Sequence, residues 1–243
     1  GLAENTLFIF MSDNGTAAGA QIYNAGMQGN KGSPYDGGHR VPLFLHWPAG
    51  GMDQGIDIDR LSAHVDMLPT LQQLCDLPVK EGYPLDGVSL VPLLKNPQAE
   101  WPERVLVTDS QRVIDPKKWK SSSTMTQRWR LVNGKALYDI AQDPGQKKDV
   151  AKKYPEVTAR LRAAYEAWWD SLQPALARHA ELVLGNPNEN PSRLTCHDWL
   201  TEGAYSPWNQ SKIRAGQIAI GDWAVRVEQA GRYRFILRRW PAE

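Results

Sequence analysis

The chain has 243 residues, of which 42% are hydrophobic and 23% are charged, as in an ordinary globular protein. Lys and Arg number 28 against 27 Asp and Glu, and the formal charge of +1 argues against a nucleic-acid binder that works through bulk charge. No apolar run approaches the roughly 18 residues that a membrane helix needs, so we expect no membrane partner.

The first half of the chain predicts strands, a long loop and a helix. Residues 6–11 form a near-continuous apolar run, typical of a strand buried on both faces of a parallel sheet. The glycine-rich stretch 16–38 lacks periodicity and predicts a long loop of the kind that carries function. Residues 41–47 predict a second strand, and residues 62–77 predict an amphipathic helix.

The second half predicts a hairpin and one long helix. Residues 105–108 predict a short strand. Two further strands, 126–132 and 137–140, are expected to pair around a turn at Asn133-Gly134. Residues 155–173 carry the clearest helical pattern of the chain.

The C-terminal stretch differs in composition. Residues 185–191 form a Gly/Pro/Asn cluster that indicates a linker or turn. Beyond it the chain is rich in Trp, Tyr and Arg, and the alternation in 223–227 and 233–237 predicts two paired strands.

Asp13 and Asn14 directly follow the first predicted strand. Open α/β sheets bind ligands where strands end, and carboxylate and amide oxygens suit Ca²⁺ or Mg²⁺. The same residues, followed by Gly15, are also an ordinary turn signal. Taken alone, they leave both interpretations open.

Three further polar residues surround the start of the second predicted strand. Lys31 lies among small residues, where its ammonium group could contact a sulfate or phosphate, although a loop lysine is usually just solvated. His39 could donate to an anion, and Arg40 could brace the loop through a carboxylate such as Asp36. Either side chain could equally be structural.

In this order the residues resemble the sulfatase family of the alkaline phosphatase superfamily. That family carries Ser-Asp-Asn-Gly, a loop, and then Lys-Gly-x-x-Tyr-Glu/Asp-Gly-Gly-x-Arg-x-Pro. The corresponding segments here are Ser12-Asp13-Asn14-Gly15 and Lys31-Gly32-Ser33-Pro34-Tyr35-Asp36-Gly37-Gly38-His39-Arg40-Val41-Pro42. Residues 64–71, 127–132 and 136–145 resemble later segments of the family.

The resemblance implies an α/β fold: the C-terminal part of a sulfatase-type mixed sheet flanked by helices, then a smaller antiparallel β subdomain and a Trp-rich β tail. We expect residues 1–100 to belong to the catalytic α/β domain. Residues 101–184 would form the C-terminal α+β subdomain, and residues 185–243 the β tail.

The resemblance also implies residue roles. Asp13 and Asn14 would be two ligands of a divalent cation, usually Ca²⁺, and Lys31 would contact the sulfate and the leaving-group oxygen. His39 falls on a variable position of the motif, so it is expected near the substrate without an assigned role. The substrate would be a sulfate ester, such as that of a sulfated carbohydrate.

The family's nucleophile is a formylglycine made in a Cys/Ser-x-Pro-x-Arg motif, which neither Cys75, Cys196 nor any serine here satisfies. The family's Asp-Asp metal ligands also lie upstream of the Ser-Asp-Asn-Gly motif. We therefore expect this chain to be inactive alone. Its expected partner is the missing N-terminal segment of a sulfatase. Three explanations are possible: the chain is a shortened sulfatase, one piece of a cleaved sulfatase, or a separate protein that has lost catalysis. The first is favoured. A secreted or periplasmic location is implied by the family alone.

Two alternatives remain open. One is a phosphodiesterase or phosphonate-ester hydrolase of the same superfamily, with the same cation and lysine. The other is a non-catalytic carbohydrate-binding protein whose tail aromatics stack on sugar rings, although packing of the tail is the favoured explanation for them. These aromatics are Trp199, Tyr205, Trp208, Trp223, Tyr233 and Trp240.

Overall fold

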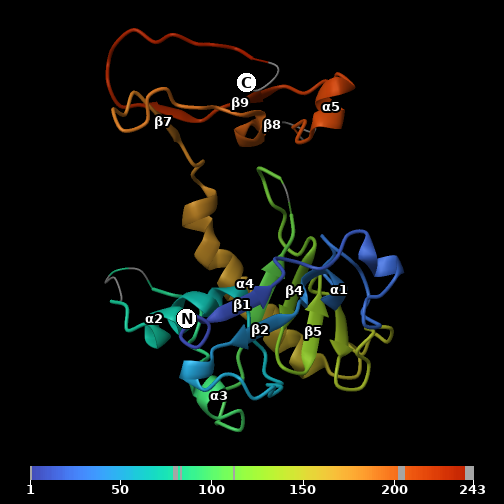
Figure 1. The fold of residues 1–243 in the computed structure, drawn as a ribbon. Coiled ribbons are helices and arrows are strands. Elements are labelled where there is room, and N and C mark those ends of the chain that lie inside the picture. The colour runs from blue at the N-terminus through green and yellow to red at the C-terminus, as the bar shows by residue number, and fades with distance from the viewer. Residues whose placement is uncertain (1, 79–81, 83, 112, 202–205, 239–243) are drawn as a thin grey trace. The chain divides into compact units, whose positions relative to one another are not determined.

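The computed structural model describes residues 2–78, 82, 84–111, 113–201 and 206–238. The chain divides into two compact units (Figure 1): residues 1–112 with 116–171, and residues 113–115 with 172–243. The three-part division expected from sequence stays a prediction. Within the described residues, no helix is both long enough and apolar enough to cross a membrane.

The first unit begins with a two-stranded antiparallel pair. Strand β1 (Phe8–Met11) pairs with β2 (Leu43–His46), in a register that runs from Phe8 opposite His46 to Met11 opposite Leu43. The expectation that the first strand is buried on both faces is wrong here, because Phe8 and Phe10 are 63% and 57% exposed. The apolar run does form a strand, but the described residues supply no third strand and no layer to cover it.

Short helices follow this pair. They are η1 (Gly19–Gln21), α1 (Asp36–His39), η2 (Pro48–Gly50), η3 (His64–Asp66), α2 (Met67–Leu74) and α3 (Val91–Lys95). The helix expected at 62–77 is confirmed as η3 followed by α2. Asp66 is buried where the two meet, and its carboxylate accepts hydrogen bonds from the Ala63 and Val88 amides and from Arg104.

A four-stranded antiparallel meander forms the centre of the first unit. Its strands are β3 (Leu106–Asp109), β4 (Ser122–Met125), β5 (Trp129–Val132) and β6 (Ala136–Asp139), paired in chain order. The predicted hairpin is confirmed: Val132 faces Ala136, and Asn133 and Gly134 adopt positive φ angles of 51° and 63°. The predicted strand starts too early, however, because Thr126 to Arg128 form the turn between β4 and β5.

The two faces of the meander are covered by different elements. Successive residues of a strand point to opposite faces. Leu131 and Leu137, which face each other across β5 and β6, pack with Leu161 of α4 (Pro155–Leu176). The next facing pair along these strands, Arg130 and Tyr138, belongs to the opposite face, and Arg130 reaches Asp36 of α1. Figure 1 shows α1 beside these strands.

The second unit is built from short elements. They are β7 (Leu182–Leu184), η4 (Cys196–Asp198), β8 (Leu200–Thr201), α5 (Gln210–Arg214), β9 (Gly221–Asp222) and β10 (Val225–Val227). The pairing expected between 223–227 and 233–237 is wrong. Strand β10 pairs in parallel with β7, β8 pairs with β9, and residues 233–237 form no strand.

The tail aromatics are placed in different ways. Trp199 and Trp223 lie edge to face with ring centroids 5.6 Å apart, and the Trp223 indole N–H donates to the Thr195 carbonyl at 2.8 Å. Both are therefore packing residues of the unit. Trp208 is 59% exposed. Tyr205 and Trp240 lie outside the described residues.

Candidate functional site

The loop after β1 carries Asp13 and Asn14. The Asn14 side-chain amide donates to Asp13 Oδ2 at 2.5 Å, and the Ser12 hydroxyl donates to the Asn14 carbonyl at 2.8 Å. His64 of η3 holds the loop from outside, because its Nε2 lies 2.8 Å from the Ser12 carbonyl, which can only accept a hydrogen bond. Asp13 follows β1, as the sequence predicts, and its side chain is exposed.

The donor set of this loop fits only part of a metal site. Carboxylate and amide oxygens are suitable ligands for Ca²⁺, but Ca²⁺ takes six to eight oxygens. Across the part of the chain that the structure describes, no three His, Cys, Asp or Glu side chains form a group that could hold a metal ion. Asp13 and Asn14 can therefore supply two ligands and need others from elsewhere.

The loop that carries Lys31 is held to the Asp13 loop through the backbone. The Lys31 amide donates to the Thr16 carbonyl at 3.0 Å, and the Gly15 amide donates to the Gly38 carbonyl at 3.0 Å. The Lys31 side chain itself is exposed. These two hydrogen bonds bring together motif segments that are separated along the chain.

Glycine is required where these segments meet. A Cβ atom on Gly15 would lie 1.9 Å from the Gly37 carbonyl oxygen, and one on Gly38 would lie 2.1 Å from the Ser33 carbonyl oxygen. A Cβ on Gly37 would lie 2.3 Å from the Gly29 carbonyl oxygen. Backbone contacts backbone at all three positions, so any side chain would push the segments apart.

Asp36 of α1 is the buried charge of the site. Its carboxylate is fully buried and accepts from Arg130 Nε at 2.9 Å, while His39 Nε2 lies 3.3 Å away and Arg40 lies 4.0 Å away. Burial opposes ionisation, but His39 and Arg130 outweigh it, so the pKa of Asp36 lies below its ordinary value. Burial of the Arg130 guanidinium lowers the pKa of that group, and Asp36 counteracts the shift.

Sequence reasoning placed His39 near the substrate, and the structure places its ring against Asp36. His39 Nε2 lies 3.3 Å from Asp36 Oδ1, and the buried Nδ1 has no hydrogen-bond partner within the described residues. The bracing contact expected from Arg40 exists only as a long ion pair with Asp36 Oδ2, and Arg40 is largely exposed. Arg130 makes the closer contact.

Sequence reasoning missed Arg130 and Gln146. The Gln146 side-chain oxygen accepts a hydrogen bond from the Asp36 amide at 2.8 Å, and Gln146 is 1% exposed. Arg130 could have been noticed as a charge inside an apolar strand, between Trp129 and Leu131. Gln146 lies in a polar turn and gives no such signal.

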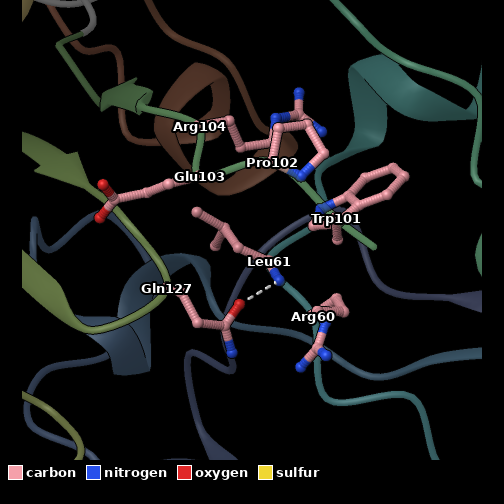
Figure 2. Close-up of a pocket in the computed structure, with 7 residues that line it drawn as sticks. All are labelled: Arg60, Leu61, Trp101, Pro102, Glu103, Arg104 and Gln127. Carbon is pink, nitrogen blue, oxygen red and sulfur yellow. Dashed lines mark hydrogen bonds between the residues drawn. The ribbon is translucent and has the colours of Figure 1, made fainter. Parts of the chain in front are cut away.

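A shallow pocket of 180 Å³ lies elsewhere in the first unit (Figure 2). In Figure 2 the Gln127 side chain points toward Leu61, whose amide donates to it at 2.6 Å. The pocket is lined by Arg60, Leu61, Trp101, Pro102, Glu103, Arg104 and Gln127. It is smaller than the roughly 300–1,000 Å³ of typical ligand sites and includes none of the predicted site residues, so we assign it no function.

Comparisons with known proteins agree with the motif. The family model described as Sulfatase matches residues 1–77. Human arylsulfatase A is 31% identical over 198 residues, which cover 67% of this chain and 37% of that protein. The N-acetylgalactosamine-6-O-sulfatase of Bacteroides thetaiotaomicron is 26% identical over 189 residues, with 68% and 37% covered.

A solved structure shows the same relationship in three dimensions. The crystal structure of Ps i-CgsB in complex with k-i-k-neocarrahexaose has a TM-score of 0.61 and 28% identity, and covers 71% of this chain and 38% of that one. The fold is thus that of an α/β protein of the alkaline phosphatase-like class. Within that class, the chain is a member of the sulfatase family, and it spans about two fifths of the length of these relatives.

Proposed function

We propose that this chain carries part of the active site of a sulfatase, an enzyme that hydrolyses sulfate esters. The observation that carries the proposal is the backbone contact between the Asp13 loop and the Lys31 loop, which includes the Gly15–Gly38 hydrogen bond of 3.0 Å. It joins the backbones of two separate motif segments, one with hard oxygen donors and the other with a lysine. An exposed ammonium group beside a cation site suits an anionic substrate.

In the proposed site each residue has a role of its own. Asp13 and Asn14 contribute two oxygen ligands to a divalent cation, with Ca²⁺ as the first choice. When bound, the cation offsets negative charge on the sulfate oxygens. Lys31 contacts the sulfate and stabilises the leaving-group oxygen, and His39 remains a candidate beside the substrate.

The remaining ligands and the nucleophile would come from residues outside this sequence. No Cys or Ser here stands in the Cys/Ser-x-Pro-x-Arg context. The exposed aromatic face of β1 and β2 is consistent with further structure covering it, because Phe8, Phe10 and Phe44 are all more than half exposed. We therefore propose that this chain alone is inactive, and that the complete protein is secreted or periplasmic.

Sulfated carbohydrates are the proposed substrate class. The names of two similar proteins support it, since one acts on an N-acetylgalactosamine 6-O-sulfate and the other was solved with k-i-k-neocarrahexaose. A sulfated sugar presents both an anion for Lys31 and a leaving-group hydroxyl. The choice among sugars stays open.

The first test is to read the coding DNA upstream of the Gly1 codon. An in-frame Cys/Ser-x-Pro-x-Arg motif, an earlier Asp-Asp pair and a signal peptide are expected. An unrelated domain in that position would remove the hydrolase proposal. The result is independent of protein folding.

The second test is activity of the complete protein on 4-nitrophenyl sulfate and on sulfated oligosaccharides. We expect Lys31→Ala to lower kcat/KM by about 100-fold, the size of effect seen when one charge-stabilising donor is removed. Lys152→Ala, at an exposed lysine beyond β6, is the matched control and should be neutral. Faster hydrolysis of a phosphonate monoester than of any sulfate ester would favour the phosphonate-ester alternative.

Among the described tryptophans of the tail, Trp208 is the most exposed and is the best candidate for the carbohydrate-binding alternative. Its ring is exposed, and Lys212 Nζ lies 5.4 Å from the ring centroid, a combination that can stack on an anionic sugar. Calorimetric titration of the whole chain with a sulfated oligosaccharide tests this, with Trp208→Ala against Trp223→Ala. Binding that only Trp208→Ala abolishes would support a binding tail.

A further inference from the structure

We propose that the buried Asp36–Arg130 ion pair is a positioning device that fixes the loops carrying Asp13, Asn14 and Lys31. The importance of the pair for catalysis rests on the proposed function of those three residues. The geometry of the pair is independent of that proposal. Asp36 and Arg130 are therefore positioning residues and not catalytic ones.

On the sheet side, Arg130 is held by several acceptors. Its Nε donates to Asp36 Oδ1 at 2.9 Å, and its terminal nitrogen donates to the carbonyls of Thr126 and Trp129, the latter at 3.0 Å. The Arg130 side chain is only 6% exposed and that of Asp36 is fully buried. A guanidinium with its stem in a strand and with Nε and one terminal nitrogen hydrogen-bonded has little freedom to move.

A second pair of contacts joins α1 to the same sheet. The Asp36 amide donates to Gln146 Oε1, beyond β6, at 2.8 Å. The Tyr35 ring, which precedes α1, lies edge-on to the Tyr138 ring of β6 with centroids 5.9 Å apart. The short helix α1 is thus anchored to β5, β6 and the turn after β6.

The residues that follow Asp36 in α1 are hydrogen-bonded directly to both loops. The next two residues after Asp36 are Gly37, whose amide donates to the Gln28 carbonyl at 2.9 Å, and Gly38, whose carbonyl accepts from Gly15 at 3.0 Å. Gly15 is adjacent to Asn14, and residue 28 lies three positions before Lys31. The contacts to the two loops are therefore made one and two residues after the buried carboxylate.

The neighbouring Arg128–Asp139 pair shows what a local ion pair looks like in the same hairpin. Arg128 donates to both Asp139 oxygens, at 3.0 and 2.5 Å, but it is 50% exposed and links the turn before β5 only to β6 of the same meander. Asp36 and Arg130 instead join residues 94 positions apart. The Arg128 pair is accordingly the matched control for the proposal.

Hydrogen–deuterium exchange of the whole chain tests the proposal without requiring activity. We expect Arg130→Met and Arg130→Lys to raise exchange in residues 12–16 and 28–38 about tenfold and about threefold, respectively, because the loops open locally when their anchor weakens. Exchange in β6 and α4 should stay within about twofold of the original chain. Arg128→Met should leave exchange in both loops unchanged.

Each outcome decides the matter. Unchanged loop exchange in a folded Arg130→Met or Arg130→Lys chain would overturn the proposal. Equal acceleration of the loops, β6 and α4 in both variants would also overturn it, because the pair would then serve global stability alone.

In the complete sulfatase, Arg130→Met should lower kcat about 100-fold with little change in KM, since misplacement by about 1 Å is enough for such a loss. Arg130→Lys should restore part of kcat, which a purely structural role would not predict once both variants are folded. An unchanged kcat in a folded Arg130→Met enzyme would refute positioning. If the parent enzyme hydrolyses no sulfate ester, the proposed function fails, while the exchange result still stands.

Discussion

Gly15→Ala is expected to destabilise the candidate site by steric contact alone. The new Cβ would lie 1.9 Å from the Gly37 carbonyl oxygen and 2.8 Å from its carbon, both backbone atoms that cannot rotate away. Restoring an ordinary contact of 3.4 Å requires the segments to separate by about 1.5 Å. The Gly15–Gly38 hydrogen bond, now 3.0 Å long, cannot survive such a shift.

The magnitude follows from these two effects. Overpacking costs about 1–3 kcal/mol, and the lost hydrogen bond costs about 1 kcal/mol. We therefore expect about 3 kcal/mol lower free energy of unfolding. Gly32→Ala is the matched control in the same loop, because its φ of +86° is unfavourable for alanine but no atom lies within 4 Å of the new Cβ. Its cost should be about 1 kcal/mol.

Urea denaturation followed by circular dichroism measures both variants against the original chain. A Gly15→Ala chain as stable as Gly32→Ala would refute the reasoning, because it would mean that the two loops are not in backbone contact. Retained slow exchange of the residue 15 amide, which is the donor to the Gly38 carbonyl, would refute it independently when alanine is present.

Three other predictions concern the core, acid stability and the exposed strands. Leu131→Ala, at a fully buried position, should cost about 3 kcal/mol of unfolding free energy, whereas Leu68→Ala, at a residue 53% exposed, should cost under about 1 kcal/mol in the same denaturation assay. Neighbouring cations lower the pKa of Asp36 and Asp139 below the ordinary 3.8. The two ionised carboxylates therefore stabilise the fold fully above pH 3.8, and this contribution is lost as the pH falls through the lowered pKa values. Thermal melts that show no loss of stability between pH 5 and pH 2 would contradict this. Phe10→Ser should reduce self-association of the chain in light scattering, because Phe10 is 57% exposed on a strand that pairs only with β2 among the described residues. If the chain associates and its molar mass is the same in the variant, this surface is not the contact.

Local sequence signals predicted the elements that depend on local chemistry. The Asn133-Gly134 turn needs two positive φ angles that Asn and Gly accept, so the hairpin could be read directly. The long α4 helix follows from its apolar spacing, which places Leu161 and Tyr165 in the core. The backbones of the Asp13 and Lys31 segments are hydrogen-bonded to each other, while the roles of their side chains stay predictions.

Elements that depend on distant partners could not be read. Strand β4 has the sequence Ser-Ser-Thr-Met, which lacks apolar alternation, yet it is buried because β3 and β5 enclose it. Phe8 is exposed because β1 pairs only with β2 among the described residues, which its own sequence does not reveal. Arg130 escaped notice because a guanidinium in a strand has meaning only once Asp36 is known to face it.

The separation of Asp36 and Arg130 along the chain has a consequence for biosynthesis. A ribosome releases Asp13, Lys31 and Asp36 long before Arg130, which follows Asp36 by 94 residues. The meander pairs only strands that are consecutive in sequence, so it can form as soon as it emerges. The loops of the candidate site therefore leave the exit tunnel well before the strand that carries Arg130 and are organised only after it. Until the meander appears, the nascent chain must carry an unpaired acidic loop and the exposed aromatic strand before it, which is the interval in which a chaperone would be of most use.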